Sequence, residues 1–146
     1  PDVVQSEVEP LMAIAKARRV TLVYKSPDNF PTIDIDESKI RQVIMNFVEN
    51  GIYYTPANGR VDVHLRATKK GIEFTVQDTG IGVSKSEQKH MFDKFYRAQN
   101  ARRMRPDGTG IGLYMAKRVI DAHGGTLIFS STEGKGSTFG FMLPLK

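Results

Sequence analysis

The sequence contains no cysteine, which excludes a disulfide scaffold and any zinc or iron–sulfur site that uses thiolate ligands. It has no apolar run near the roughly 18 residues that a membrane-spanning helix needs. No signal-peptide pattern opens the chain, and it begins with Pro1 rather than Met, so we expect a fragment of a longer protein. Together these absences predict a soluble domain from a reducing compartment.

Acidic residues are scarce in one stretch of the chain. The 146 residues carry a formal net charge of +5, and residues 84–105 contain seven basic but only two acidic side chains. Such a basic strip is typical of a solvated segment or of a surface that binds a polyanion. A nucleic-acid interface is the weaker interpretation, because Phe47, Phe74 and Phe141 fall at core positions rather than on an exposed stacking platform.

The length and hydrophobic content predict one globular domain. A chain with 40% hydrophobic and 25% charged residues can bury one core of its own without disulfide bonds. Apolar residues at helical spacing predict three helices. These lie over residues 3–17, with a start or a kink near Pro10, over residues 36–54, with Asp36 or Ser38 as the cap, and over residues 111–123.

Alternating hydrophobic residues predict the strands. They are expected at residues 20–24, 32–35, 61–67, 72–76, 127–129 and 138–143, with turns at Asn58-Gly59, 69–71 and 133–136. Because short turns join most of these strands, the sheet is expected to be mixed and mostly antiparallel. The fold class is therefore α+β, a two-layer α/β sandwich in which three helices cover one face of the sheet.

Two amide side chains mark the second predicted helix. At about 100° per residue, Asn46, Asn50 and Tyr53 fall together on one edge of its apolar face. Amides four residues apart can hydrogen-bond to each other or offer oxygen ligands to Mg²⁺, a hard cation that also keeps waters and phosphate oxygens. Taken alone, the pair equally fits amides that satisfy backbone groups or face water.

Three glycine-rich segments lie at strand or helix ends. Residues 78–82, Asp-Thr-Gly-Ile-Gly, place a carboxylate beside backbone that a planar ligand can approach. Residues 108–113, Gly-Thr-Gly-Ile-Gly-Leu, lead into the last predicted helix, whose free N–H groups favour phosphate. The third, at residues 134–138, also fits an ordinary hairpin. No segment matches a Walker P-loop or a dinucleotide-binding fingerprint, and the irregular stretch between the first two predicts a binding loop or lid.

The order of these elements resembles the catalytic and ATP-binding domain of two-component sensor histidine kinases, which has the Bergerat (GHKL) fold. Residues 40–55 resemble its N box, residues 78–82 its first glycine box and residues 91–98 its F box. Residues 108–113 and 134–139 resemble its two later glycine boxes. The resemblance covers nearly the whole chain, so residues 1–146 are expected to form one catalytic domain, with an ATP lid at about residues 80–109.

The resemblance implies ATP and Mg²⁺ as ligands and assigns roles to single residues. Asp78 would accept a hydrogen bond from the adenine amino group, with Thr138 helping through water, and Asn50 would bind Mg²⁺. Asn46 and Arg97 are supporting catalytic candidates, Arg97 through a phosphate contact from the lid. The residues assigned to ATP binding are Asn46, Asn50, Tyr53, Tyr54, Asp78, Gly80, Ile81, Gly82, Arg97, Gly108, Thr109, Gly110, Ile111, Gly112, Leu113 and Thr138.

Two positions depart from the family pattern. Members usually have Lys or Arg three residues after the Mg²⁺-binding asparagine, where this chain has Tyr53, a residue without positive charge. Gly51 stands where alanine is usual and lowers the helix propensity. The first departure leaves open a nucleotide-binding regulatory module without transfer activity. An ATPase of the same fold is disfavoured, because Asn46 occupies the position where related hydrolases have a glutamate base.

The resemblance also implies partners. None of the three histidines lies in a His-Glu/Asp-x-x-x-Pro context, so the phosphoacceptor histidine is expected on a separate dimerisation domain of the parent protein. ATP bound with Mg²⁺ would donate its γ-phosphoryl group there, for relay to an aspartate of a response regulator. The expected domain is cytoplasmic, contacts neither nucleic acid nor membrane, and is a monomer by itself within a homodimeric parent.

Overall fold

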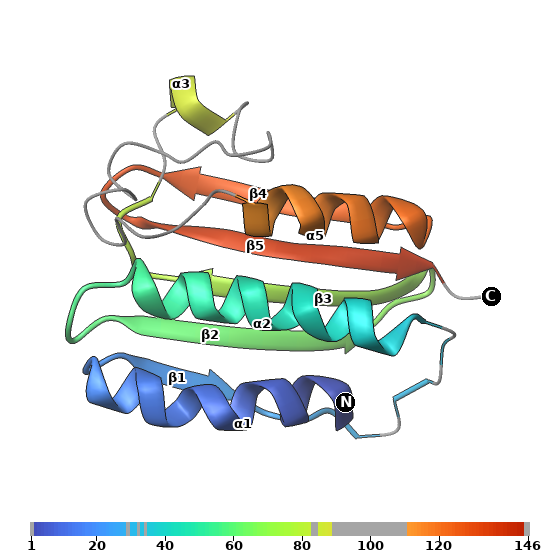
Figure 1. The fold of residues 1–146 in the computed structure, drawn as a ribbon, viewed down its shortest axis with the longest axis horizontal. Helices are drawn as coiled ribbons and strands as arrows, with labels where there is room; N and C mark the ends of the chain where they lie inside the picture. The colour runs from blue at the N-terminus through green and yellow to red at the C-terminus, as the bar shows by residue number, and fades with distance from the viewer. Residues whose placement is uncertain are drawn as a thin grey trace.

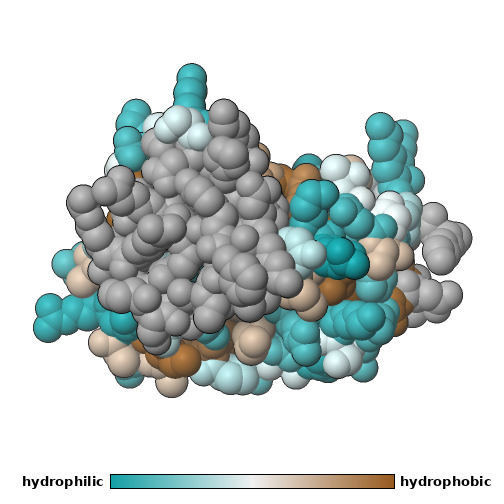
Figure 2. All heavy atoms as spheres, turned by 45° about the horizontal axis from the view of Figure 1, so that its top comes forward, coloured by the Kyte–Doolittle hydropathy of each residue, from teal (hydrophilic) through white to brown (hydrophobic). Residues whose placement is uncertain are grey.

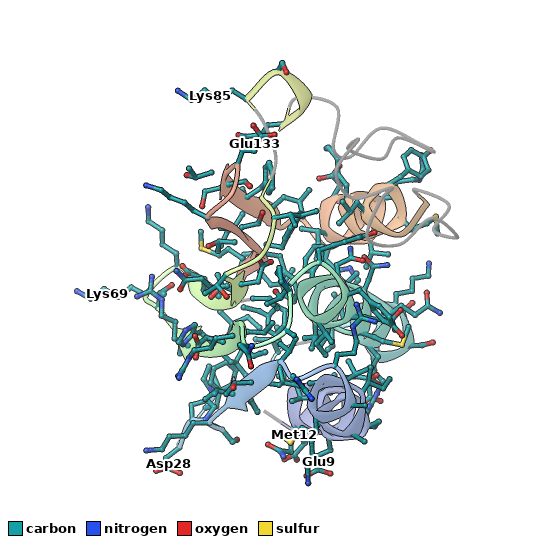
Figure 3. The ribbon with its side chains drawn as sticks, turned by 90° about the vertical axis from the view of Figure 1, so that its left-hand side faces the viewer. Glu9, Met12, Asp28, Lys69, Lys85 and Glu133 are labelled. Carbon is teal, nitrogen blue, oxygen red and sulfur yellow. The ribbon has the colours of Figure 1, made fainter. Side chains whose placement is uncertain are left out.

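The chain folds into one sheet with helices on one of its faces. The computed structural model describes residues 2–28, 30, 31, 33, 35–82, 85–88 and 111–144. Within these residues, three long helices cover one face of a five-stranded sheet (Figure 1). The end-on view of Figure 3 shows the helices on one side of the sheet and Lys69, in a turn between strands, on the other. The predicted α+β two-layer sandwich is confirmed.

The sheet has the strand order β1-β2-β3-β5-β4. β1 (Thr21–Tyr24) pairs in parallel with β2 (Arg60–Ala67), and all other neighbours pair antiparallel. β3 (Gly71–Asp78) lies in the centre between β2 and β5 (Gly136–Pro144), while β4 (Thr126–Thr132) forms the edge beyond β5. A helix separates β1 from β2 in the sequence, as a parallel pair requires, whereas short turns join the antiparallel pairs β2–β3 and β4–β5. The antiparallel neighbours β3 and β5 are far apart in the sequence.

The helical layer consists of α1 (Asp2–Ala17), α2 (Glu37–Tyr53) and α5 (Ile111–Ala122), and the four-residue helix α3 (Lys85–Gln88) lies apart from it (Figure 1). α1 begins at Asp2, so a helix start near Pro10 is excluded. Pro10 lies inside α1 at an exposed position. The buried face of α1 continues across the proline from Val8 to Leu11, and this burial outweighs the missing N–H group.

The segment between β1 and α2 departs from the prediction. Alternating residues predicted a strand over residues 32–35, but Ile33 and Ile35 have no regular secondary structure. Both are half-buried and pack against the core from a loop. A period of two over only four residues therefore does not specify a strand, because a loop lying across a core places alternate side chains inward as well.

α2 lies between α1 and α5 and carries much of the core (Figure 1). The carboxylate of Asp36 caps its first turn by accepting a hydrogen bond from the Lys39 amide at 3.3 Å, as the sequence predicted. Its inward side chains meet the inner face of the sheet, where the rings of Phe47 and Phe139 lie 5.8 Å apart. The buried apolar residues of α2 are Ile40, Val43, Ile44, Phe47, Val48 and Ile52.

Aromatic side chains fill the centre of the core. The rings of Phe74 on β3 and Phe141 on β5 stack at 5.2 Å, and both side chains are almost completely buried. Burial of one such side chain contributes about 1.5–3 kcal/mol to stability. The core positions predicted for Phe47, Phe74 and Phe141 are therefore confirmed.

Hydrophobic residues at the surface are scattered. Figure 2 shows them as small patches between hydrophilic side chains on the described part of one face. The large apolar side chains with the greatest exposure, Met12, Val23, Met45 and Met115, come from four different elements. Across the residues that the structure describes, no helix combines the length and the apolar character needed to cross a membrane.

Candidate functional site

Polar groups from separate parts of the chain meet at the end of the sheet where α2 and β3 both terminate. α2 ends at Tyr53 and β3 ends at Asp78. The amide of Ile81 donates a hydrogen bond to the carbonyl oxygen of Tyr54 at 3.1 Å, which ties the two ends together. The turn between β4 and β5 lies at the same end, on the left of Figure 1.

Asp78 is a buried carboxylate at the last position of β3. Its Oδ1 accepts hydrogen bonds from the amides of Gly80 at 2.9 Å and Ser137 at 3.1 Å. Burial raises the pKa of Asp78 from 3.8 to about 6, and the two amide hydrogen bonds oppose that shift. No described residue donates to Oδ2, so this oxygen keeps its capacity to accept a hydrogen bond.

Gly80 and Gly82 bring backbone close to Asp78. A Cβ at Gly80 would collide with the carbonyl oxygen of Tyr54 and with Oδ1 of Asp78. Gly82 has a φ of 67°, in the left-handed region, and a Cβ there would collide with the carbonyl oxygen of Thr132. The glycines after Asp78 are therefore required by the packing of the chain against itself, while their predicted role in letting a planar ligand approach stays a prediction.

Ser137, rather than Thr138, accompanies Asp78. In the β3–β5 ladder Ser137 lies opposite Asp78, whereas Thr138 lies opposite Gln77. Successive side chains of a strand point to opposite faces of the sheet, so Thr138 faces away from Asp78 and does not take the place that the sequence assigned to it. The alternation with the buried Phe139 was the available indication that Ser137 faces inward.

Asn46 and Asn50 form the predicted pair on α2. Nδ2 of Asn50 donates to Oδ1 of Asn46 at 3.2 Å, and no described residue donates to Oδ1 of Asn50. This oxygen is a hard donor of the kind that Mg²⁺ binds. Across the described part of the chain, no group of three or more His, Cys, Asp or Glu residues is placed to hold a metal ion. A cation at Asn50 would therefore take most of its ligands from a bound anion and water.

Tyr53 and Tyr54 complete the end of α2. The Tyr53 ring lies beside Arg18, whose guanidinium carbon is 4.6 Å from the ring centroid. Tyr54 is half-buried, and its carbonyl oxygen accepts from Ile81. Arg18 was not predicted as a site residue. It follows α1, 35 positions before Tyr53, and no local pattern identifies a contact that depends on the packing of two helices.

The remaining predicted residues belong to α5 and the segment before it. Ile111 and Gly112 open α5, and Leu113 in its first turn is half-buried against the core. The start of a helix presents free N–H groups that favour a phosphate. Arg97, Gly108, Thr109 and Gly110 lie outside the described residues, as do residues 83, 84 and 89–109 of the predicted lid.

The described beginning of the lid segment contacts the β4–β5 hairpin. The side-chain amide of Gln88 on α3 donates to the carbonyl oxygen of Ser131 at 3.0 Å. The backbone amide of Gly134 donates to the carbonyl oxygen of Ile81 at 2.8 Å. Oγ of Ser131 lies 2.7 Å from Oγ of Ser137, whose amide binds Asp78. Hydrogen bonds thus connect α3 with the Asp78 carboxylate.

Together, these groups present a carboxylate oxygen for an N–H donor, an amide oxygen for a hard cation and glycine backbone that a flat ligand can approach. The carboxylate and the amide lie at the ends of two elements that are tied by backbone hydrogen bonds. The arrangement therefore suits binding and orientation of a ligand.

Comparisons with known proteins identify the family and the fold of the chain. Residues 35–146 match the family described as histidine kinase-, DNA gyrase B- and HSP90-like ATPase. The sensor histidine kinase WalK of Bacillus subtilis is 37% identical over 135 residues, which are 91% of this chain and 22% of that protein. The chain thus spans about a fifth of this relative's length.

Solved structures show the same fold. The mycobacterial sensor histidine kinase MprB superposes with a TM-score of 0.81 at 26% identity, covering 98% of this chain and 93% of the other. Full-length ShkA, solved in complex with AMPPNP, gives a TM-score of 0.83 at 28% identity, covering 98% of this chain and 29% of the other. The chain belongs to the histidine kinase-, DNA gyrase B- and HSP90-like ATPase family, as a catalytic domain of the type found in sensor histidine kinases.

Proposed function

We propose that this domain binds ATP with Mg²⁺ and donates the γ-phosphoryl group to a histidine on the dimerisation domain of its parent sensor kinase, for relay to a response regulator. The observation that carries the proposal is the buried Asp78, whose Oδ1 holds two amides while Oδ2 keeps its capacity to accept. Membership of an ATPase family and the AMPPNP bound to the similar ShkA support a nucleotide as the ligand.

Adenine recognition is assigned to Asp78. With a pKa of about 6, its carboxylate is mostly ionised at pH 7 and forms a charge-assisted hydrogen bond with the adenine amino group. Gly80 lets the chain pass close to Oδ1 of Asp78 and to the Tyr54 carbonyl oxygen, beside the proposed place of the base. We assign Ser137 as the polar group beside Asp78, in place of Thr138. Tyr54 lies along the base or the ribose, next to the Ile81 contact.

The residues present fit a Mg²⁺ ion. Oδ1 of Asn50 would hold it, since Asn46 already binds the Nδ2 group of Asn50 and thereby orients that oxygen outward. A single protein oxygen suits Mg²⁺, which usually keeps waters and takes phosphate oxygens as its other ligands. When bound, the ion would neutralise charge on the β- and γ-phosphates.

Phosphoryl transfer then needs only positioning by this domain. The bond between the γ-phosphorus and the bridging oxygen breaks, ADP leaves, and a bond forms to a ring nitrogen of the histidine on the dimerisation domain. The amides at the start of α5 hold phosphate oxygens at Ile111 and Gly112. Gly108, Gly110 and Arg97 extend this contact in the proposed lid, at about residues 80–109.

The setting of the domain is proposed from the family. Residues 1–146 form one cytoplasmic catalytic domain that is monomeric by itself and works within a homodimeric parent. Its partners are ATP, the dimerisation domain and, through that domain, a response regulator. A second candidate function is a regulatory module that binds nucleotide without transfer, which the uncharged Tyr53 near Asn50 favours.

Calorimetric titration with AMPPNP and Mg²⁺ tests the proposal. We expect the wild-type chain to bind with a dissociation constant between about 1 μM and 1 mM, or about −8 to −4 kcal/mol. Asp78→Asn should weaken binding by at least a hundredfold, because an amide replaces the ionised acceptor. Glu73→Gln is the matched control, since Glu73 lies on the same strand but pairs with Arg66 on the outer face.

Two results would contradict the proposal. One is the absence of binding by the wild-type chain at millimolar nucleotide, and the other is equal affinity of wild type and Asp78→Asn. Radiolabelled transfer from ATP to the dimerisation domain of the parent protein then separates a kinase from the regulatory module. Label on the histidine supports the kinase, and nucleotide binding without label supports the module.

A further inference from the structure

Arg18 reaches the end of α2 from the turn after α1. Its guanidinium carbon lies 4.6 Å from the centroid of the Tyr53 ring, and its Nη2 donates to the Tyr53 carbonyl oxygen at 3.3 Å. The packing of α1 against α2 creates this contact. A guanidinium that stacks on a ring and also binds a carbonyl is held in one orientation.

The charge of Arg18 has no acidic partner in the part of the chain that the structure describes. By contrast, Arg41, Arg60 and Arg66 each bind a carboxylate at 2.9–3.1 Å. Nε of Arg18 is buried without an acceptor, and Nη2 binds only a neutral carbonyl. Because an unbalanced, partly buried cation lowers stability, this arrangement favours an anion that comes from outside these residues.

The position of Tyr53 on α2 connects the Arg18–Tyr53 contact with Asn50, the proposed Mg²⁺ ligand. Tyr53 follows Asn50 by three residues, and residues three or four apart are neighbours on a helix surface. Asn46 precedes Asn50 by four residues and binds it, so all three side chains lie on one edge of α2. The Tyr53 ring, with Arg18 on it, therefore lies on the same edge of α2 as the oxygen proposed to hold Mg²⁺.

We infer that Arg18, held on the Tyr53 ring, binds the phosphates of the nucleotide and makes the site prefer ATP over adenosine. The inference rests on the proposed function and identifies a residue from α1 that supplies the positive charge absent from position 53. A planar guanidinium donates two parallel hydrogen bonds to phosphate oxygens. Tyr53 is then a positioning residue, because it acts by holding Arg18 in place.

The experiment compares a charged with an uncharged ligand. Arg18→Gln is titrated with AMPPNP and Mg²⁺ and, separately, with adenosine. We expect the dissociation constant for AMPPNP to rise about ten- to a hundredfold, the usual effect of losing a hydrogen bond to a charged group, while that for adenosine stays within twofold. Arg18→Lys keeps the positive charge without the planar guanidinium, so its affinity for AMPPNP should fall less than that of Arg18→Gln. Arg19→Gln, at the exposed neighbouring arginine, is the matched control and should change neither constant.

Variants of Tyr53 test the positioning role. Tyr53→Leu removes the ring and should weaken AMPPNP binding like Arg18→Gln, and the double variant should be no weaker than either single one. Tyr53→Lys in the Arg18→Gln background should restore binding, because the cation returns through α2. If the Arg18–Tyr53 contact only held α1 against α2, Tyr53→Lys would not restore AMPPNP binding.

The outcomes separate the two proposals. If the wild-type chain binds neither ligand, the proposed function fails. If the wild-type chain binds both and Arg18→Gln has unchanged affinity for AMPPNP, the role of Arg18 alone is overturned. Equal weakening for AMPPNP and adenosine, together with a lower unfolding temperature, also overturns it, because that pattern reports damage to the fold.

Discussion

The two ends of α2 satisfy their polar groups to different degrees. At its N-terminal end, Asp36 accepts from the Lys39 amide, and the Asp36 amide donates to Nε2 of His123 at 3.0 Å. Nδ1 of His123 lies 2.8 Å from the carbonyl oxygen of Val119 and therefore carries the proton that it donates. This closed set of hydrogen bonds joins α2 to the end of α5.

At the C-terminal end of α2, some polar atoms have hydrogen-bonding capacity that no described residue uses. Within the described chain, no residue donates to Oδ2 of Asp78 or to Oδ1 of Asn50. Nε of Arg18 is one of two buried side-chain polar atoms without a partner among the described residues, the other being Oη of Tyr24 on β1. A buried donor without an acceptor, at the same end of α2 as two oxygens with spare acceptor capacity, favours a ligand there. The comparison therefore separates polar groups that hold the fold from polar groups that are kept for binding.

Asp78→Asn gives the largest expected change in stability. The folded-state pKa of Asp78 is about 6 and its ordinary value is 3.8, so between these pH values the folded state binds more protons than the unfolded state. Stability therefore falls by about 3 kcal/mol as the pH rises from about 4 to above 6. Asparagine carries no charge and still accepts from Gly80 and Ser137, so it should remove this loss and stabilise the unliganded chain at pH 7.

Urea unfolding at pH 4 and pH 7.5 measures this effect in wild type, Asp78→Asn and the Glu73→Gln control. The wild type and Glu73→Gln should share the pH-dependent loss, and Asp78→Asn should lack it. A variant that is less stable than the wild type at pH 7.5 would show that the ionised carboxylate stabilises the fold, and the proposed division between the two ends of α2 would fail.

His123→Ala removes hydrogen bonds at the N-terminal end of α2 and should have the next largest effect on stability. It removes the acceptor of the Asp36 amide and the donor to Val119, which together cost about 1–2 kcal/mol of stability. Nucleotide affinity should stay within twofold, because the site lies at the other end of the helix. His64→Ala, at an exposed histidine on β2, is the control and should leave the unfolding midpoint unchanged.

Sequence periodicity was enough to predict the layers and part of the site. The spacing of Asn46 and Asn50 on one helix predicted a contact that depends only on helix geometry, and the structure contains it. A feature set within a single element is thus readable from the chain. The glycines after Asp78 were predicted to let backbone approach a planar ligand, and the structure gives them a different constraint, because a side chain there would collide with carbonyl oxygens of Tyr54 and Thr132.

Features that depend on two elements were not readable in the same way. Thr138 was assigned instead of Ser137, because the assignment followed a motif and not the register between β3 and β5. Arg18 was overlooked, since its contact with Tyr53 requires α1 to lie against α2. The predicted strand at residues 32–35 failed because a short alternating segment serves a core-lining loop equally well.

Gly51→Ala should give the smallest change in stability. Helix propensity alone predicts the wrong sign for this change, because the buried face of α2 is tightly packed here. Alanine gains about 1 kcal/mol in propensity, but its Cβ would lie 3.2 Å from Cγ1 of Val61 and 3.3 Å from Cγ1 of Val76, both fully buried. Crowding a packed core costs about 1–3 kcal/mol, and contacts of 3.2 and 3.3 Å, which need only small shifts, lie at the lower end of that range, so we expect a net loss of about 1 kcal/mol or less.

A double-mutant cycle measured by urea unfolding isolates this crowding. In a Val61→Ala background the nearer contact is gone and only the one with Val76 remains, so Gly51→Ala should destabilise that background less than it destabilises the wild type. Additive effects would mean that the crowding by Val61 does not require the glycine. A smaller loss would show that Gly51 is kept for its fit against the sheet, and that this end of α2 contains both a tightly packed buried face and polar atoms that are left for a ligand.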